Sequence, residues 1–194
     1  MEMKAPVYRL DRDKLIKVVH YVCANCSPEE LGSVKLHRIL YFSDMLHFLS
    51  TGEPLTGVEY RKQQFGPTAR HLAWAVNELA AQGKLKIEQR DYFGFSKTDY
   101  IAVQQPGPGS LSNHAVQILN DVIAFVCSRS AKEISELSHD AAWQAAEIGE
   151  VIPYHAALGL LPCAITDSDV AAAIEEAHRV APIIEKENAA AQVL

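Results

Sequence analysis

The chain has 194 residues, of which 48% are hydrophobic and 22% are charged. This length suits one well-packed domain with room for a small appendage, and the composition excludes a mostly disordered or fibrous protein. The net charge of −6 is uneven: residues 1–110 carry 14 Lys and Arg against 12 Asp and Glu, while residues 111–194 carry 4 against 12. The acidic second part disfavours general binding to nucleic-acid phosphates.

The beginning of the chain and its cysteines bear on location and cofactors. No run of about 18 apolar residues is present, and the first residues lack the apolar core of a signal peptide, so we expect a cytoplasmic protein with reduced thiols and no membrane contact. Cys23 and Cys26 form one C-x-x-C pair, but a structural zinc site needs four ligands and no second pair completes it. We interpret both thiols as incidental and expect no cofactor.

The first third of the chain predicts helices. Apolar residues spaced three and four apart predict helices over about 13–25 and 34–50, and the wide apolar face of the second predicts a central position. Residues 53–65 lose this period and predict an extended segment or a short strand. Gly66-Pro67 is predicted to open a third helix that runs to about residue 82, with proline in its first turn.

Residues 84–103 follow as a predicted β-hairpin, because apolar and charged residues alternate along them. A helix followed by a hairpin is the outline of a winged helix, which suggests a DNA-binding regulator. The charges give this alternative weak support. The helix carries Arg70 against Glu78, a net of zero, and the hairpin carries four basic residues against three acidic ones.

The second half reads as mainly helical. A linker-like loop at 104–110 precedes predicted helices over about 112–128 and 130–138, a helix-compatible stretch at 139–147, a turn at 149–154 and a last helix over about 167–187. The fold class that we predict is mainly α (α+β), a single helical domain with a small β-hairpin or short sheet and a winged-helix-like segment. We place this domain at 1–165, and a C-terminal helix with a frayed tail at 166–194.

Two groups of polar residues raise the question of catalysis. Ser138, His139 and Asp140 are the residue types of a hydrolase triad, but consecutive side chains point apart and a triad needs a chain of hydrogen bonds in space. On the helix predicted over 34–50, polar and aromatic residues follow one another at intervals of four, three and four positions. This spacing places His37 and Asp44 on one helix face, where we expect a packing surface. A hydrolase or metal enzyme using His139 or the Cys23/Cys26 pair remains the least favoured alternative, and we predict a protein that is not an enzyme.

Residues 34–72 carry a pattern of the form K-L-x-K/R-L/I-L-Y-F, then G-x-P-L, then an extended piece ending in G-P. The matching residues are Lys35, Leu36, Arg38, Ile39, Leu40, Tyr41, Phe42, Gly52, Pro54, Leu55, Gly66 and Pro67. A second block consists of Leu137, Ser138, His139, Trp143, Gly149, Ile152, Pro153 and Tyr154. With these two blocks, the chain resembles the Panacea domain, the SocA-like antitoxin and phage-associated family, over about residues 30–160.

The resemblance implies an antitoxin that neutralises a co-encoded toxin by direct protein contact, in one branch of the family as an adaptor that delivers the toxin to a protease. It implies no metal, nucleotide or catalytic residue. We expect the motif residues themselves to be largely structural. This chain departs from the family in Gln63-Gln64-Phe65, where an aromatic residue is common before the Gly-Pro, and in Thr68, where a hydrophobic residue is usual.

The tip of the predicted hairpin is the candidate partner-binding site. Tyr92, Phe93 and Phe95 surround Gly94, and three aromatic residues in four are unusual for a turn that only reverses the chain. One alternative is that the rings fold back as a lid on the core. The other is that they are exposed and bind a protein partner, since binding energy concentrates in a few aromatic residues.

Overall fold

The structure is a computed structural model of the chain, and it describes residues 8–92, 94–107, 109–161, 171, 174–175 and 179. It divides the chain into two compact units, residues 1–160 and 161–194. In the second unit the described residues Ala171, Ile174, Glu175 and Arg179 are helical, and most of the helix predicted over 167–187 lies outside the described residues.

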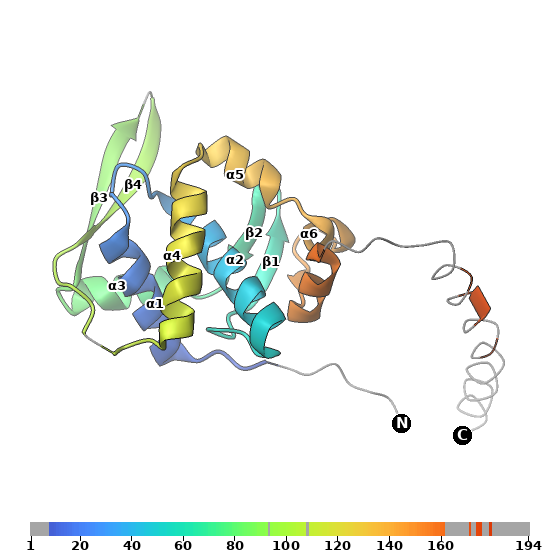
Figure 1. Cartoon of the computed structure of the whole chain (residues 1–194). Coiled ribbons are helices and arrows are strands. Elements are labelled where there is room, and N and C mark those ends of the chain that lie inside the picture. Colours follow the sequence, from blue (N-terminus) through green and yellow to red (C-terminus); the bar gives the residue numbers. More distant parts are fainter. Residues whose placement is uncertain are drawn as a thin grey trace, which may run out of the picture. The chain divides into compact units, whose positions relative to one another are not determined.

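Helices dominate the first unit, and the strands form two small antiparallel sheets, which confirms the predicted fold class (Figure 1). The helices are α1 (Arg12–Asn25), α2 (Ser33–Thr51), α3 (Leu72–Ala81), α4 (Asn113–Cys127), α5 (Ala131–Leu137) and α6 (Ala141–Ala145), with a 3-10 helix η1 (Tyr154–Leu160). The strands are β1 (Tyr60–Gln63), β2 (Gly66–Ala69), β3 (Leu85–Tyr92), β4 (Phe95–Ala102) and β5 (Val151–Ile152).

The α2 helix is the centre of the fold, as its wide apolar face predicted. It packs against α1, α4, α5, β2 and η1, and its buried residues extend from Lys35 to Met45. Leu36, Ile39 and Leu40 are completely or almost completely buried. The helix ends at Gly52, whose left-handed conformation lets its N–H bond to the carbonyl of Phe48.

The prediction that Gly66-Pro67 opens a helix is wrong. Both residues belong to β2, which pairs with β1, and α3 begins only at Leu72, after His71 in a left-handed conformation. Proline is tolerated here because β2 is an edge strand of the sheet, whose order is β2-β1-β5. The stretch 149–154, predicted as a turn, contributes β5, which pairs with Tyr60 and Arg61 of β1.

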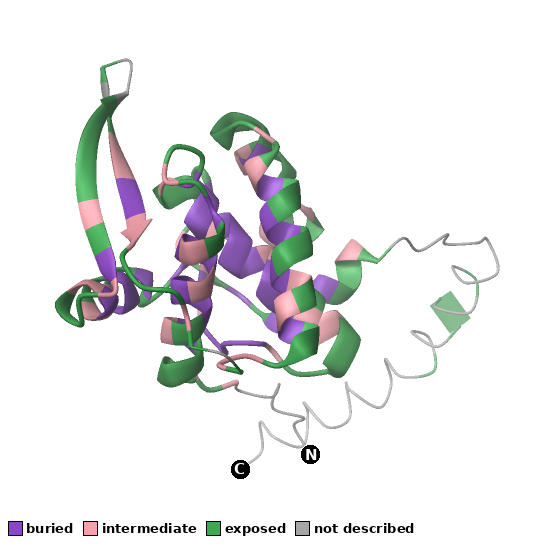
Figure 2. Ribbon diagram, turned by 60° about the vertical axis from the view of Figure 1, so that its left-hand side comes forward, coloured by how far each residue is buried: buried purple, intermediate pink, exposed green. Residues whose placement is uncertain are grey.

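The second sheet is the predicted hairpin of β3 and β4, paired from Leu85 opposite Ala102 to Tyr92 opposite Phe95. Its outer part is mostly exposed (Figure 2). The helix that precedes it, α3, packs against β3 and α1. The winged-helix outline is therefore present, but α3 has Glu78 as its only charged residue, so its surface lacks the basic side chains that bind DNA phosphates.

Candidate partner-binding surface

A buried arginine organises the hairpin of β1 and β2. Arg38 comes from α2 and is 2% exposed, and its guanidinium donates hydrogen bonds to the carbonyl oxygens of Phe65 and Pro67. Ser135 of α5 donates a third bond, from its hydroxyl to the Phe65 oxygen at 3.0 Å. Burial lowers the pKa of Arg38 to about 10, so it stays charged at neutral pH and fixes the backbone on both sides of Gly66.

Gly66 has a structural role that explains the Gly-Pro of the family motif. Its φ of +109° is rarely open to other residues. A Cβ atom at this position would lie 2.5 Å from both Nη2 of Arg38 and Oγ of Ser138. The hairpin therefore approaches α2 and α5 so closely that only glycine fits between them.

The arrangement fixes the backbone of Phe65 and leaves its side chain exposed, which matters for binding. Its carbonyl is held by Arg38 and Ser135, yet its side chain is 69% exposed, the highest value among the exposed large hydrophobic residues described. An aromatic ring on a fixed backbone loses little conformational entropy when a partner covers it. Phe65 thus has the properties of a residue that dominates the binding energy of a protein interface.

Trp143 lies beside the same hairpin, in α6. Its ring stacks on His139, with centroids 3.9 Å apart and planes 15° apart. Lys62 of β1 lies over the same ring, with its Nζ 4.0 Å from the ring centroid. The Trp143 Nε1 donates to the carbonyl of Gln63 at 3.2 Å. Both side chains of this stacked pair are only partly buried, so the pair also contributes to the surface.

Other exposed apolar residues lie on segments joined to the β1–β2 hairpin: β5 pairs with β1, the loop before β5 bonds to Lys62, and α5 bonds to Phe65 through Ser135. Leu137 ends α5, Val151 is in β5, and Ile148 is in the loop whose Gly149 donates its N–H to Lys62. Together with Phe65 and Trp143 they define what we call the β1 face: Phe65, Leu137, Trp143, Ile148 and Val151. Exposed apolar residues gathered on neighbouring segments are typical of protein interaction sites.

The three residues of the triad type each have a different structural partner. The Ser138 hydroxyl donates to the carbonyl of Ser135, and His139 stacks on Trp143. Asp140 caps α6 and accepts a bond from the hydroxyl of Tyr41 at 3.0 Å. Burial raises the pKa of both Tyr41 and Asp140. This geometry lacks the serine–histidine–aspartate relay of a hydrolase.

The stripe on α2 also has packing roles. Asp44 is 1% exposed and accepts bonds from the backbone N–H of Thr56 at 2.7 Å and from the Tyr60 hydroxyl at 2.6 Å. Burial raises its pKa despite these donors. His37 accepts the N–H of Ala69 on Nδ1 at 3.0 Å, and burial together with the Arg38 charge lowers its pKa to about 4.

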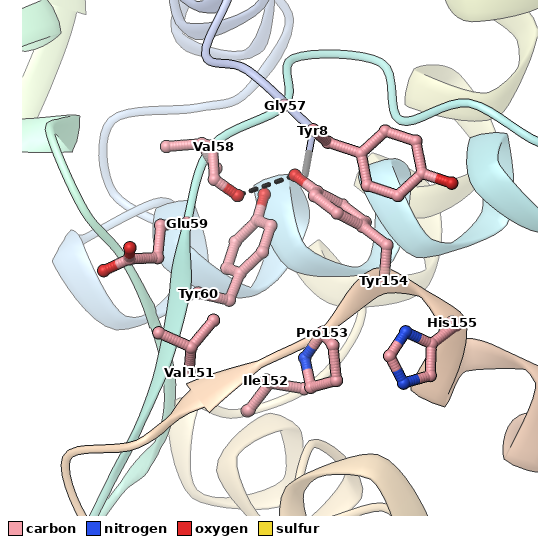
Figure 3. Close-up of a pocket in the computed structure, with 10 residues that line it drawn as sticks. All are labelled: Tyr8, Gly57, Val58, Glu59, Tyr60, Val151, Ile152, Pro153, Tyr154 and His155. Atoms are coloured by element: carbon pink, nitrogen blue, oxygen red, sulfur yellow. Dashed lines mark hydrogen bonds between the residues drawn. The ribbon is translucent and has the colours of Figure 1, made fainter. Parts of the chain in front are cut away.

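The last three residues of the second motif block, Ile152, Pro153 and Tyr154, line a pocket of about 240 Å³ at the β5 edge of the sheet (Figure 3). The lining residues are Tyr8, Gly57, Val58, Glu59, Tyr60, Val151, Ile152, Pro153, Tyr154 and His155. The hydroxyl of Tyr154 donates to the Val58 carbonyl at 2.6 Å (Figure 3), and that of Tyr60 donates to Asp44 at 2.6 Å. Because these hydroxyls are engaged within the fold and the volume is below the usual range of ligand pockets, about 300 Å³ and above, Pro153 and Tyr154 have a structural role here.

The remaining motif residues are mostly internal. Leu36, Leu40 and Tyr41 belong to the core, and Phe42 packs against it. Lys35 is 8% exposed and donates to the carbonyl of Cys127 at 3.4 Å. Of the hairpin tip proposed from the sequence, Phe93 and the side chains of Tyr92 and Phe95 lie outside the described residues.

Sequence reasoning missed Arg38 and Phe65 as partners in one site. Arg38 was noted only as a member of the motif, and Phe65 only as a departure from the family pattern. A usable signal was present: a polar Gln63-Gln64 pair and an aromatic residue directly before Gly-Pro is compatible with the exposed turn of a hairpin.

Comparison with known proteins gives one family. The family model described as "Antitoxin SocA-like, Panacea domain" matches residues 36–144, more than half of the chain. The matched range contains Arg38, Phe65 and Trp143, whereas Lys35, Pro153 and Tyr154 lie outside it. No significant match was found to a curated protein or to a solved structure.

Two searches for other kinds of site gave negative results over the part of the chain that the structure describes. None of the helices in this part is long and apolar enough to cross a membrane. Within the same residues, no group of three or more His, Cys, Asp or Glu side chains has the geometry to hold a metal ion.

Proposed function

Because the chain belongs to the SocA-like antitoxin family with a Panacea domain, we propose that it neutralises a co-encoded toxin by binding it directly. The observation that carries this proposal is Phe65, an exposed ring on a backbone fixed by a buried arginine. An exposed ring on a fixed backbone suits tight binding to a protein partner.

The β1 face is the toxin-binding surface in this proposal, with Phe65 and Trp143 as its aromatic residues. Nζ of Lys62 lies over the Trp143 ring, so β1 presents a positive charge next to the apolar residues, whereas the charge of Arg61 is paired with Glu59 at 2.7 Å. A toxin with an apolar cavity bordered by acidic residues fits this combination. Delivery of the bound toxin to a cellular protease is a further possible step of the same function.

The aromatic tip of β3 and β4, with Tyr92, Phe93 and Phe95, remains our second proposed contact. It lies on a different sheet from Phe65. The two contacts can therefore be tested separately by substitutions that leave the other sheet untouched.

The experiment is growth rescue and binding with the protein encoded by the neighbouring gene. Phe65→Ala is expected to keep the melting temperature within a few degrees, because the ring is mostly exposed. It is expected to lose about 2 kcal/mol or more of affinity, roughly thirtyfold, and to fail in rescue at normal expression. Val103→Ala, which truncates another exposed apolar residue at 61% exposure, is the matched control and should rescue normally.

Two other outcomes would place the toxin contact elsewhere or contradict the proposed function. If Phe93→Ala plus Phe95→Ala abolishes binding while Phe65→Ala does not, the toxin binds the hairpin tip instead of the β1 face. If the wild-type protein neither binds the neighbouring protein nor rescues growth, the proposed function itself is contradicted.

A further inference from the structure

Two cysteines that are far apart in sequence meet at the ends of two helices. Cys26 is the C-cap of α1, and Cys127 is the last residue of α4. Their Sγ atoms lie 3.7 Å apart, and both thiols are free. The sequence pairing of Cys26 with Cys23 in a C-x-x-C therefore does not identify its nearest reactive neighbour.

The distance between the two sulfurs is close to what a disulfide requires. A disulfide bond is about 2.05 Å long, so the sulfurs need to approach by less than 2 Å. Both residues sit at helix ends, where side-chain rotation and small backbone shifts are easier than in a helix interior. Cys23 lies one turn earlier in α1, is 2% exposed, and has its pKa raised by burial to about 12, so its thiol is unreactive.

The surroundings give the two thiols different roles. Cys127 is partly exposed, and its pKa is lowered by the hydrogen bond with Cys26 and by the Lys35 ammonium, while partial burial and Glu30 oppose this shift. Cys26 is 8% exposed and its pKa is raised, first by the hydrogen bond with Cys127 and then by burial. A partly exposed thiol whose pKa is lowered, 3.7 Å from a second thiol that stays protonated, is the arrangement found at redox-sensitive cysteine pairs.

We propose that Cys26 and Cys127 form a reversible intramolecular disulfide when the protein meets a peroxide oxidant. The Cys127 thiolate attacks one oxygen of hydrogen peroxide, the O–O bond breaks, and Cys127 sulfenic acid and hydroxide form. The Cys26 sulfur then attacks the Cys127 sulfur, the S–S bond forms and the S–O bond breaks. The leaving hydroxide and the Cys26 proton become water, and the two thiols together have given two electrons to the peroxide.

The position of the bond determines its effect on the molecule. It closes a loop from residue 26 to residue 127 that contains α2, both hairpins and α3. A cross-link across so long a loop restricts the unfolded chain strongly. The oxidised protein therefore resists unfolding, and the part of the fold that carries Phe65 is retained under oxidative conditions.

The test uses the reduced full-length protein treated with a small excess of hydrogen peroxide. We expect the mass to fall by two hydrogens, and a tryptic digest without reductant to join peptide 18–35 to peptide 98–129. The melting temperature should rise by roughly 5–15 °C and return after dithiothreitol. Because Cys23 shares the first peptide, the linkage is assigned in the Cys23→Ala variant, where it should persist.

Cysteine variants distinguish the Cys26–Cys127 disulfide from other cross-links. Cys127→Ser, at a partly exposed position that tolerates serine, should abolish the cross-link and the rise in melting temperature, as should Cys26→Ala. Cys163→Ser should change neither. The proposal is overturned if peroxide only adds oxygen to the thiols, if the linkage joins Cys23 to Cys26, or if the cross-linked product is a dimer.

Discussion

His37 shows how one partly buried side chain makes the fold sensitive to acid. In the folded protein, burial and the neighbouring Arg38 charge lower its pKa to about 4, whereas an unfolded histidine titrates near its ordinary value of about 6.5. The unfolded chain therefore takes up a proton first as the pH falls. The stabilisation from neutral His37 is fully present above about pH 6.5 and is lost as the pH falls toward 4.

His37→Asn is expected to remove most of this dependence. The asparagine oxygen can accept the Ala69 N–H that His37 accepts now, but it does not titrate. Between pH 7 and pH 5, the wild-type free energy of unfolding should fall by about 2 kcal/mol more than that of the variant, as measured by urea denaturation at each pH. Equal losses of unfolding free energy in the two proteins would show that the pKa of His37 is not lowered in the native state.

Trp143→Ala tests the half-buried ring on the β1 face. The substitution removes the stack on His139, the contact with Lys62 and the bond to Gln63. We expect a loss of about 2–3 kcal/mol in unfolding free energy, below the usual 3–5 kcal/mol for a fully buried aromatic residue. Thermal melting checks this value. An unchanged melting curve would mean that Trp143 contributes to the surface alone.

At the scale of the elements, the β1–β2 hairpin depends on its contact with α2 and α5. Gly66→Ala places a methyl group against Arg38 and Ser138, in a backbone conformation that alanine rarely adopts. We expect a loss of about 3 kcal/mol or more. Gly52→Ala is the matched control, because Gly52 also has positive φ but has nothing within 4 Å of its Cβ position, and it should cost about 1 kcal/mol.

Chemical denaturation of the two glycine variants measures the difference. Similar losses in both would show that the hairpin moves away from α2 at little cost. In that case Arg38 would not fix the backbone of Phe65, and the Phe65 ring would lose its rigid support.

The elements that the sequence predicts well are those with local signals. Ser112 and Ser130 cap α4 and α5 through their side chains, Ser130 in a capping box with Glu133. The β3–β4 hairpin shows alternation along adjacent strands. The elements that were mispredicted depend on contacts between residues distant in sequence. Tyr60 pairs with Ile152 across more than ninety positions, and no local sequence pattern predicts such a pairing.

The candidate site escaped sequence analysis for a related reason. The partners of Arg38 are the carbonyl oxygens of Phe65 and Pro67, and backbone carbonyls carry no residue identity that a motif could reveal. The Gly-Pro dipeptide was ambiguous, since it is compatible with a helix start and with an edge strand. The close approach of α2 and α5 to Gly66 decides between the helix start and the edge strand.

At the scale of the whole molecule, the proposed division near residue 165 can be tested by truncation. Among the described residues, every buried hydrophobic side chain lies between Leu15 and Ala157. We therefore expect a chain that ends at residue 160 to unfold cooperatively, with a melting temperature within a few degrees of the full chain. A large drop, or exposed apolar surface detected by dye binding, would show that residues 161–194 belong to the same cooperative unit.

The hydrogen bonds from Arg38 to the hairpin have a consequence for thermodynamic linkage. The tip that carries Phe65 is held in shape by residues of α2 and α5, so a toxin that binds it as proposed would recognise the native state and not the unfolded chain. Free toxin at one hundred times its dissociation constant would then stabilise the fold by about 2.7 kcal/mol. By the same relation, a substitution that unfolds the protein would release the proposed toxin in active form, even when it lies far from the bound surface.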